Sequence, residues 1–210
     1  MPMQTLDHLV VAVPDLAAAM EEFSETLGAP FVVGGRHPHR GTHNALLNLG
    51  QGAYLELIAP DPTNTAVAPP RWMGVDLITQ PTLTRWALKA SPLAKYAMAL
   101  AAYRAELAEV QGGERETPEG KCLRWQLTVP LPSPQVEVAP FLIDWSASEQ
   151  HPTDSLAPAQ CQVVQLRILH PEPDRVNAVL ASLSTDWRAE WALEPRLQAT
   201  LRCPRGEITI

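Results

Sequence analysis

The first apolar segment of the chain, Leu6 to Val13, alternates in the way that a half-buried strand requires. Every second residue from His8 to Ala12 shares one face, and the residues between them share the other. The first face therefore carries one polar side chain, that of His8. Pro14 and Asp15 follow and predict the start of a helix, because proline cannot extend a central strand and aspartate accepts hydrogen bonds from free N–H groups.

Two later segments repeat this order of strand, proline and helix. The three prolines lie 78 and 79 residues apart, at Pro14, Pro92 and Pro171. Aligned on proline, His8 corresponds to Trp86 and to Gln165. Solenoid repeats are shorter, about 20–50 residues, so the pattern predicts repeated structural modules.

Each module is predicted to have the order β-α-β-β-β. In the first we expect a strand over 6–13, a helix over 16–27 that stops at Gly28, a strand over 31–33, a break at Gly34 and Gly35, a basic loop over 36–41, and strands over 42–49 and 53–59. In the second we expect a strand over 83–90, a helix over 93–110 that Gly112 and Gly113 end, a strand near Arg115, a turn over 118–120, and strands over 122–129 and 138–145. In the third we expect a strand over 161–169, a helix over 173–183, and closing strands over 188–193, 197–203 and 207–210.

These elements predict an α+β fold in which the modules form a cupped, mixed or antiparallel sheet with helices on its outer face. The expected modules are 1–62, 75–150 and 160–210, held in one compact unit. On the helix-packed face we expect the side chains of Leu9, Val11, Phe23, Leu27, Leu55 and Leu57.

Composition narrows the class of protein. The chain has 210 residues, is 46% hydrophobic and carries a formal net charge of −7. It has no basic block, which argues against nucleic acid and membrane surfaces as partners and favours a small molecule or another protein, including a second copy in a homodimer. No apolar run reaches about 18 residues and no signal-peptide pattern is present, so a cytoplasmic location is expected. The cysteines are three in number and far apart, which predicts buried thiols rather than a disulfide or a zinc site.

Polar residues in apolar strands mark the candidate chemistry. Glu56 interrupts the strand over 53–59 on the same face as Tyr54, and Asn44 rather than His43 is expected to share the cup face with Leu46. The loop over 36–41 carries two arginines that could bind a carboxylate or phosphate, but a solvated loop is also compatible with its composition. His37, His39 and His43 resemble a cluster in the sequence, and the alternative for His37 and His39 is a solvated position in this loop.

Five segments resemble the glyoxalase-like domain family of the vicinal oxygen chelate superfamily. They are Leu6-Asp7-His8-Leu9-Val10, the stretch 35–44, Tyr54-Leu55-Glu56-Leu57, Leu123-Arg124-Trp125-Gln126-Leu127 and Pro140 to Trp145. The resemblance covers nearly the whole chain and implies β-α-β-β-β modules whose sheets surround a metal or ligand site. It also implies that His8 and Glu56 hold a divalent iron, manganese, nickel or zinc ion with positions open to adjacent oxygens of a substrate.

The second module departs from that family pattern. Trp86 stands where a further ligand is expected, and only Asp144 could coordinate there. A durable metal site needs three or four protein ligands, so a hydrogen-bonded His8 and Glu56 pair without metal is the alternative.

The functional hypothesis is a small-molecule enzyme with lyase, isomerase or dioxygenase chemistry, in which His8 and Glu56 are catalytic. The candidate substrate-binding residues are Asn44, Tyr54, Trp86, Arg115, Trp125 and Asp144. Trp86 and Trp125 fit a core as well as a pocket wall, Arg115 could instead pair with a nearby glutamate, and His151 is expected at the surface. The alternatives are a protein that sequesters a ligand between aromatic residues, and a structural module whose cup is filled by its own side chains.

Overall fold

The computed structural model describes residues 3–116 and 122–210. The first part of the chain forms β1 (Leu6–Ala12), α1 (Leu16–Leu27), β2 (Val32–His37), β3 (Thr42–Gly50), β4 (Ala53–Pro60), η1 (Trp72–Leu77), β5 (Thr82–Lys89), α2 (Leu93–Tyr103), η2 (Ala105–Ala108), β6 (Val110–Glu116), β7 (Cys122–Thr128) and β8 (Phe141–Asp144). The rest forms η3 (Pro152–Ser155), β9 (Gln162–His170), α3 (Pro173–Ser182), β10 (Ala189–Trp191), β11 (Arg196–Cys203) and β12 (Gly206–Thr209).

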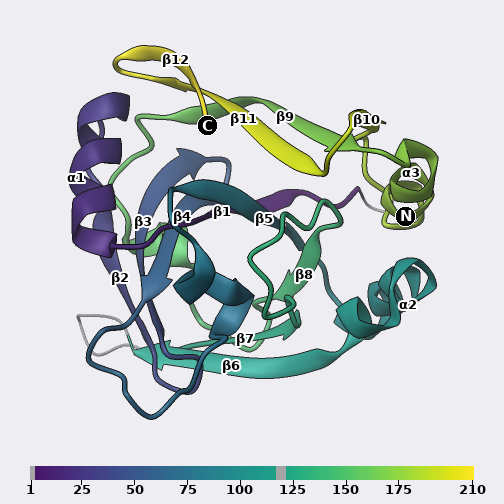
Figure 1. Cartoon of the computed structure of the whole chain (residues 1–210), viewed down its shortest axis with the longest axis horizontal. Helices are drawn as coiled ribbons and strands as arrows, with labels where there is room; N and C mark the ends of the chain where they lie inside the picture. The colour runs from purple at the N-terminus through teal and green to yellow at the C-terminus, as the bar shows by residue number, and fades with distance from the viewer. Residues whose placement is uncertain (1–2, 117–121) are drawn as a thin grey trace.

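The larger sheet joins the first two modules edge to edge (Figure 1). Its order is β2-β3-β4-β1-β5-β8-β7-β6, with β1 parallel to β4, β5 parallel to β8, and β1 antiparallel to β5. The edge strands β2 and β6 contact each other, so the sheet curls into a cup. Helix α1 packs on β3 and β4, and α2 packs on β6, β7 and β8. The predicted α+β fold, a cupped mixed sheet of β-α-β-β-β modules, is confirmed.

Two hydrophobic clusters lie on opposite faces of this sheet. The outer cluster, beneath the helices and the smaller sheet, includes all six residues predicted for the helix-packed face: Leu9, Val11, Phe23, Leu27, Leu55 and Leu57. The inner cluster includes Val10, Ala12, Ile58, Phe141 and Ile143. The alternation read from the sequence therefore assigns the faces of β1 and β4 correctly, because side chains of a strand point to opposite faces in turn.

Helix α1 has the ends that its sequence predicts. The Asp15 carboxylate accepts a hydrogen bond from the Ala18 backbone N–H (2.9 Å), which satisfies one of the free donors of the first turn. Gly28 ends the helix in the left-handed conformation, at φ 71°, which glycine adopts without steric cost.

Helix α2 is shorter than predicted. It ends at Tyr103, because Arg104 is extended (φ −156°, ψ 118°), and the residues expected to complete the helix form η2 and the start of β6. Gly112 and Gly113 therefore lie within β6 rather than at a helix end. Pairing of β6 along the full length of β7 outweighs the apolar periodicity that suggested a longer helix.

Strand β2 is longer than predicted and runs through the two glycines. It continues from Val32 to His37, with a register shift beside Gly35, whose φ is 154°. A bulge of this kind bends a strand without ending it. In contrast, β8 occupies only the central part of the predicted 138–145 strand, and the predicted turn at 118–120 lies outside the described residues.

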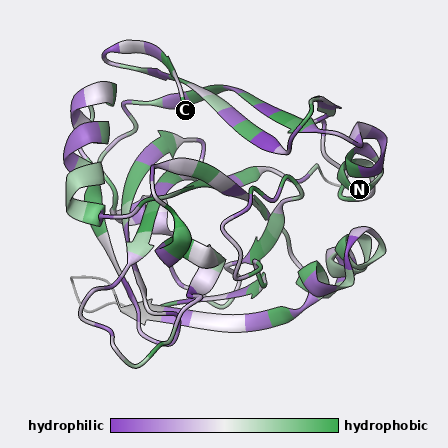
Figure 2. Ribbon diagram, viewed as in Figure 1, coloured by the Kyte–Doolittle hydropathy of each residue, from purple (hydrophilic) through white to green (hydrophobic). Residues whose placement is uncertain are grey.

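The C-terminal module has the predicted order of elements but a different topology. Strand β9 lies between β10 and β11 and is parallel to β10, whereas in the first two modules the first strand is parallel to the last. Hydrophobic and hydrophilic residues alternate along β11 (Figure 2), and its apolar side packs toward β5 of the larger sheet. The module boundaries remain a prediction.

The expectation that the cysteines form no disulfide is wrong. Cys161 and Cys203, separated by 42 residues in sequence, form a disulfide, and Cys122 is an exposed thiol. The cause is the antiparallel register of β9 and β11, which pairs Gln162 with Arg202 and so places the flanking cysteines opposite each other. The spacing of the cysteines in the sequence does not reveal how β9 and β11 are paired.

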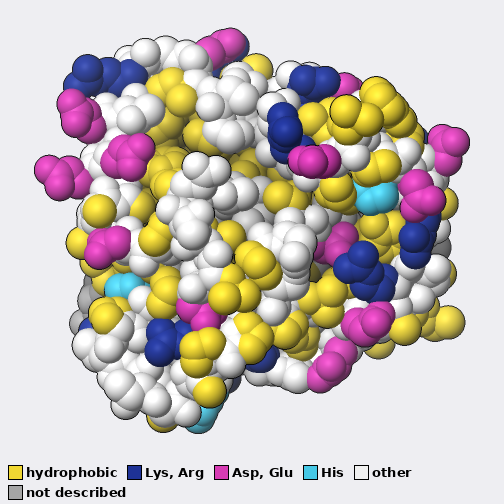
Figure 3. Space-filling view, viewed as in Figure 1, with side chains coloured by type: hydrophobic (Ala, Val, Ile, Leu, Met, Phe, Trp, Pro, Cys, Tyr) yellow, Lys and Arg dark blue, Asp and Glu magenta, His cyan; other side chains and the backbone are white. Residues whose placement is uncertain are grey.

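Acidic and basic side chains are interspersed on the face shown in Figure 3. Hydrophobic side chains gather there over β10, and Trp191 and Leu193 in this part of the chain are largely exposed. Within the described ranges, no helix is long and apolar enough to cross a membrane. The cytoplasmic location and the homodimer remain predictions.

Candidate functional site

His8 and Glu56 face each other inside the cup. They lie on the neighbouring parallel strands β1 and β4. Glu56 is opposite Val10, which is two residues beyond His8 and on the same face of β1. Both side chains are buried, and His8 Nε2 is 3.7 Å from Glu56 Oε2. The predicted approach of these groups is confirmed, and the separation leaves each within reach of one shared water or ligand oxygen.

Asp7 holds His8 from the other side, a contact that the sequence analysis missed. Asp7 Oδ1 lies 2.5 Å from His8 Nδ1, and Asp7 is fully buried. Strict alternation would separate these neighbours, but the pairing of β1 with β5 shifts register between Leu6 and His8. The signal in the sequence was a carboxylate in an otherwise apolar strand.

The second Asp7 oxygen binds the segment that follows β8. Asp7 Oδ2 lies 3.0 Å from His151 Nε2 and accepts a hydrogen bond from Trp145 Nε1 (3.1 Å). His151 is thus part of the buried network, and its expected place at the surface is wrong. Burial by itself would raise the pKa of Asp7, but hydrogen bonds and attraction from His151 and His8 lower it to about 2.

This pKa gives a pH-dependent stability. The folded-state pKa of Asp7 lies below its usual value of 3.8, so Asp7 stabilises the fold above about pH 4, and this stabilisation is lost as pH falls through about 2. The shift corresponds to about 2 kcal/mol. We expect Asp7→Asn to be less stable than the parent in urea unfolding near pH 6. The difference between their free energies of unfolding should shrink by about 2 kcal/mol as the pH falls toward 2. A difference in stability that stays the same across this pH range would contradict the stabilising role of the Asp7 carboxylate.

Asn44 orients the catalytic candidate Glu56. Its Nδ2 donates to Glu56 Oε1 (2.5 Å), while its Oδ1 is buried without a hydrogen-bond partner among the described residues. Gly34 makes this position possible, because a Cβ there would lie 2.4 Å from Asn44 Oδ1. Asn44 lines the cup and the half-buried His43 does not, as the strand alternation predicted.

Aromatic side chains form the rest of the wall. The Tyr54 ring stacks on the His8 imidazole with centroids 4.6 Å apart, and Phe141 meets that imidazole edge-on at 5.2 Å. Trp125 also lines the cavity, as expected. The sequence analysis did not assign four further ring-bearing side chains to this wall: His37, Trp72, Phe141 and Trp145. His37 is buried, with Nδ1 3.0 Å from Thr42 Oγ1, so the solvated alternative is wrong for this residue.

Trp86 and Asp144 do not face the cup, contrary to expectation. Trp86 belongs to the outer cluster, and its Nε1 donates to the Val138 carbonyl (2.8 Å). Ile143 takes the inward position on β8, and Asp144 accepts instead from the Ser146 backbone N–H (2.9 Å). Arg115 belongs to β6, but its side chain lies outside the described part of the structure.

The cavity beside His8 and Glu56 is small. Its volume is about 30 Å³, which is room for about one water. Part of the cup is filled by the connection between β4 and β5, which inserts Met73 and Val75 into the inner cluster and places Trp72 in the cavity wall. Met73 is held at φ 57°, an uncommon conformation for a residue with a side chain. A ligand larger than water therefore has to displace wall side chains.

The donors present do not make a full metal site. Among the described residues, no group of three or more His, Cys, Asp or Glu side chains is placed to hold a metal ion. His8 Nε2 and Glu56 Oε2 are suitable donors, but two protein ligands are fewer than the three or four of a durable site.

A larger groove lies on the other side of the sheet. It has a volume of about 540 Å³ and is formed by the segment before β1, the β3–β4 turn and the start of β9. Its polar lining consists mainly of glutamine side chains, and Asp186 is its only ionisable side chain among the described residues. The groove thus lacks the acid–base groups that the cup provides.

The comparisons with known proteins identify the family of the chain and support its fold. The model of the glyoxalase-like domain family matches residues 6–184, so the chain belongs to that family. No curated protein matches the sequence significantly.

Among solved structures, a hypothetical protein from Staphylococcus aureus is 16% identical, with a TM-score of 0.65 over 93% of this chain and 88% of that one. This likeness supports the fold. Methylmalonyl-CoA epimerase from Mycobacterium tuberculosis is 22% identical, with a TM-score of 0.42 over 66% of this chain and 86% of that one. A variant of the Streptomyces coelicolor methylmalonyl-CoA epimerase, in complex with 2-nitronate-propionyl-CoA, is 18% identical, with a TM-score of 0.45 over 71% of this chain and 99% of that one.

Proposed function

We propose that the protein is an enzyme that moves a proton on a carbon next to a carbonyl group of a small molecule, in an isomerase or lyase reaction. The observation that carries this proposal is the buried pair of His8 and Glu56, 3.7 Å apart in the cup. Buried acid–base pairs that face a cavity are the usual means of proton transfer in enzymes.

In the proposed step, Glu56 removes the proton. The C–H bond breaks, an O–H bond forms on the carboxylate, and the electron pair moves into an enolate. His8, when both its ring nitrogens carry protons, donates Nε2–H to the enolate oxygen. Asp7, 2.5 Å from His8 Nδ1, fixes the ring and acts as a positioning residue. Return of the proton from Glu56 to another carbon of a conjugated enolate completes an isomerisation, whereas return to the same carbon restores the substrate.

Deuterium exchange tests this step directly. In D₂O, the protein should exchange the methyl protons of 4-acetylbenzamide, a neutral aryl ketone, faster than buffer does, as followed by proton NMR. The exchange should survive dialysis against a chelator, with elemental analysis confirming that metal has been removed. Loss of exchange on metal removal would favour a divalent ion on His8 and Glu56. Absence of exchange above the buffer rate, with binding established by calorimetry, would refute the proton-transfer function.

The second candidate is a non-catalytic binding protein. It is favoured by the aromatic wall of Tyr54, Trp125 and Phe141, which suits the apolar face of a ring-shaped ligand. Binding of 4-acetylbenzamide without exchange, in the parent and in Glu56→Gln alike, is the result that would select it.

A further inference from the structure

A second cavity adjoins the first and opens toward the turn between β2 and β3. Its volume is about 70 Å³. It shares four wall residues with the cavity at His8 and Glu56: His37, Trp72, Trp125 and Leu127. Its remaining walls come from residues 38–40 and 112–114. The two cavities are therefore separated only by the thickness of shared side chains.

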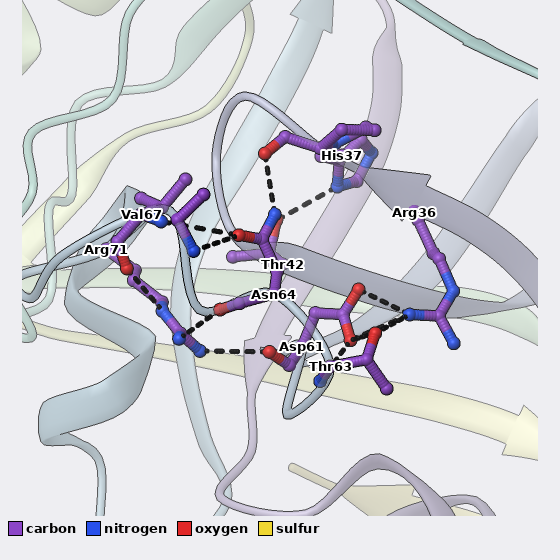
Figure 4. A network of polar contacts seen from close by, with 10 residues as sticks. Arg36, His37, Thr42, Asp61, Thr63, Asn64, Val67 and Arg71 are labelled. Atoms are coloured by element: carbon purple, nitrogen blue, oxygen red, sulfur yellow. Dashed lines mark hydrogen bonds and ion pairs between the residues drawn. The ribbon is translucent and has the colours of Figure 1, made fainter.

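Arg36, near the end of β2, and Arg40, in this turn, have different surroundings. Arg36 is committed to the carboxylate of Asp61, with Nη1 2.6 Å from Oδ2, and it also donates to Thr63 (Figure 4). Arg40 lines the second cavity and makes no salt bridge within the described part of the chain. Its guanidinium lies over the Trp72 ring, 5.3 Å from the centroid, and Nη2 donates to Gln111 Oε1 (2.5 Å). Arg40 is thus a half-buried positive charge, held in place by neutral groups.

Among the described residues, the one carboxylate that lines this cavity is that of Glu114, and its charge is already balanced. Glu114 Oε2 lies 3.4 Å from Arg124 Nε, which offsets its charge. Glu109 attracts Arg40 but accepts its hydrogen bond from Gln111 Nε2 (2.6 Å). The cavity therefore favours an anion, and a planar guanidinium suits a carboxylate because it presents two parallel donors.

Strand β6 leaves space for such a group. At Gly112 the nearest atom to a Cβ would be the Trp125 carbonyl oxygen at 3.8 Å, an ordinary van der Waals contact, so nothing crowds the strand at this position. At Gly113 a Cβ would lie 2.6 Å from the Trp125 ring. The absence of a side chain there lets the indole lie against the strand, where it forms a flat wall common to both cavities.

We propose that Arg40 binds the carboxylate of the substrate, so that the enzyme acts on a small carboxylate whose carbonyl end reaches His8 and Glu56 and whose apolar middle lies against Trp72 and Trp125. The assignment of the carbonyl end rests on the proposed function. The carboxylate subsite rests on the charge and geometry around Arg40. Binding across both cavities requires Trp72, on the connection between β4 and β5, to move aside.

A matched pair of probes tests the subsite. We expect 4-acetylbenzoate to bind about tenfold more tightly than its neutral analogue 4-acetylbenzamide, because a charge-assisted hydrogen bond to Arg40 is stronger than one to a neutral amide. This preference corresponds to about 1.4 kcal/mol. Arg40→Gln should bind the two probes equally. Arg36→Gln, a change of the same kind at an arginine already paired, should keep the preference. Calorimetry gives the affinities, and thermal melting checks that both variants fold.

The outcomes separate the subsite from the chemistry. Equal binding of the two probes by the parent, or a preference that survives Arg40→Gln, overturns the subsite while deuterium exchange of 4-acetylbenzamide continues to support the proton-transfer function. A preference that depends on Arg40 without any exchange supports the subsite and refutes the function. Failure of both probes to bind overturns the proposed substrate class.

Discussion

Replacing Glu56 by glutamine is expected to slow the deuterium exchange of 4-acetylbenzamide by about 10²- to 10⁴-fold, the usual contribution of a general base. Glutamine has nearly the same shape, and its amide oxygen can still accept the hydrogen bond that Asn44 Nδ2 gives to Glu56. The loss therefore reflects the missing base rather than a missing contact. The rate is measured by proton NMR in D₂O at equal protein concentration.

Glu190→Gln is the matched control for this experiment. Glu190 lies on β10 and pairs with Arg167 (2.5 Å) at the surface, outside the cup. It should leave the exchange rate unchanged, and thermal melts should show both variants folded. If Glu56→Gln exchanges as fast as the parent, the base is another group and the proposed role of Glu56 is wrong.

Leu57→Ala is expected to destabilise the protein by about 2–5 kcal/mol, the combined loss of apolar burial and the cost of a cavity. Leu57 is fully buried and lies between Val11 on β1 and Ala45 on β3, on the face of the sheet that α1 covers. The free energy of unfolding is measured in urea. The effect should appear as a lower midpoint with an unchanged slope, since the surface exposed on unfolding stays nearly the same.

Leu193→Ala provides the comparison at an exposed leucine. Leu193 is 82% exposed, so its truncation should change the stability by no more than about 0.5 kcal/mol. Equal effects of the two truncations would mean that β4 does not bury its Leu57 face, and the assignment of the two faces of the sheet would fail.

The repeat pattern assigned Trp86 to the wrong face of the sheet. Alignment on proline equates Trp86 with His8, but the antiparallel pairing of β1 with β5 places Ala87 opposite His8 and Trp86 opposite Leu9. Residues directly opposite each other share a face of the sheet. Trp86 therefore joins Leu9 in the outer cluster, and a one-residue difference in register reverses its predicted face.

The sequence by itself determined the strand faces and the helix ends of this protein, because these features depend on residues that are close together in the chain. The two-residue period of β1 and β4 placed His8 and Glu56 in the cup, and Asp15 and Gly28 set the ends of α1. These predictions succeed because strand alternation and helix capping act over a few residues.

Only the tertiary structure decided the contacts made between distant segments. The Asp7 carboxylate meets His151 across 144 residues, the Cys161–Cys203 disulfide depends on the β9–β11 register, and Trp72 enters the cup from a connection between modules. Each depends on strand register or on the path of a connecting segment. Both are set by the packing of the whole chain, which no local pattern records.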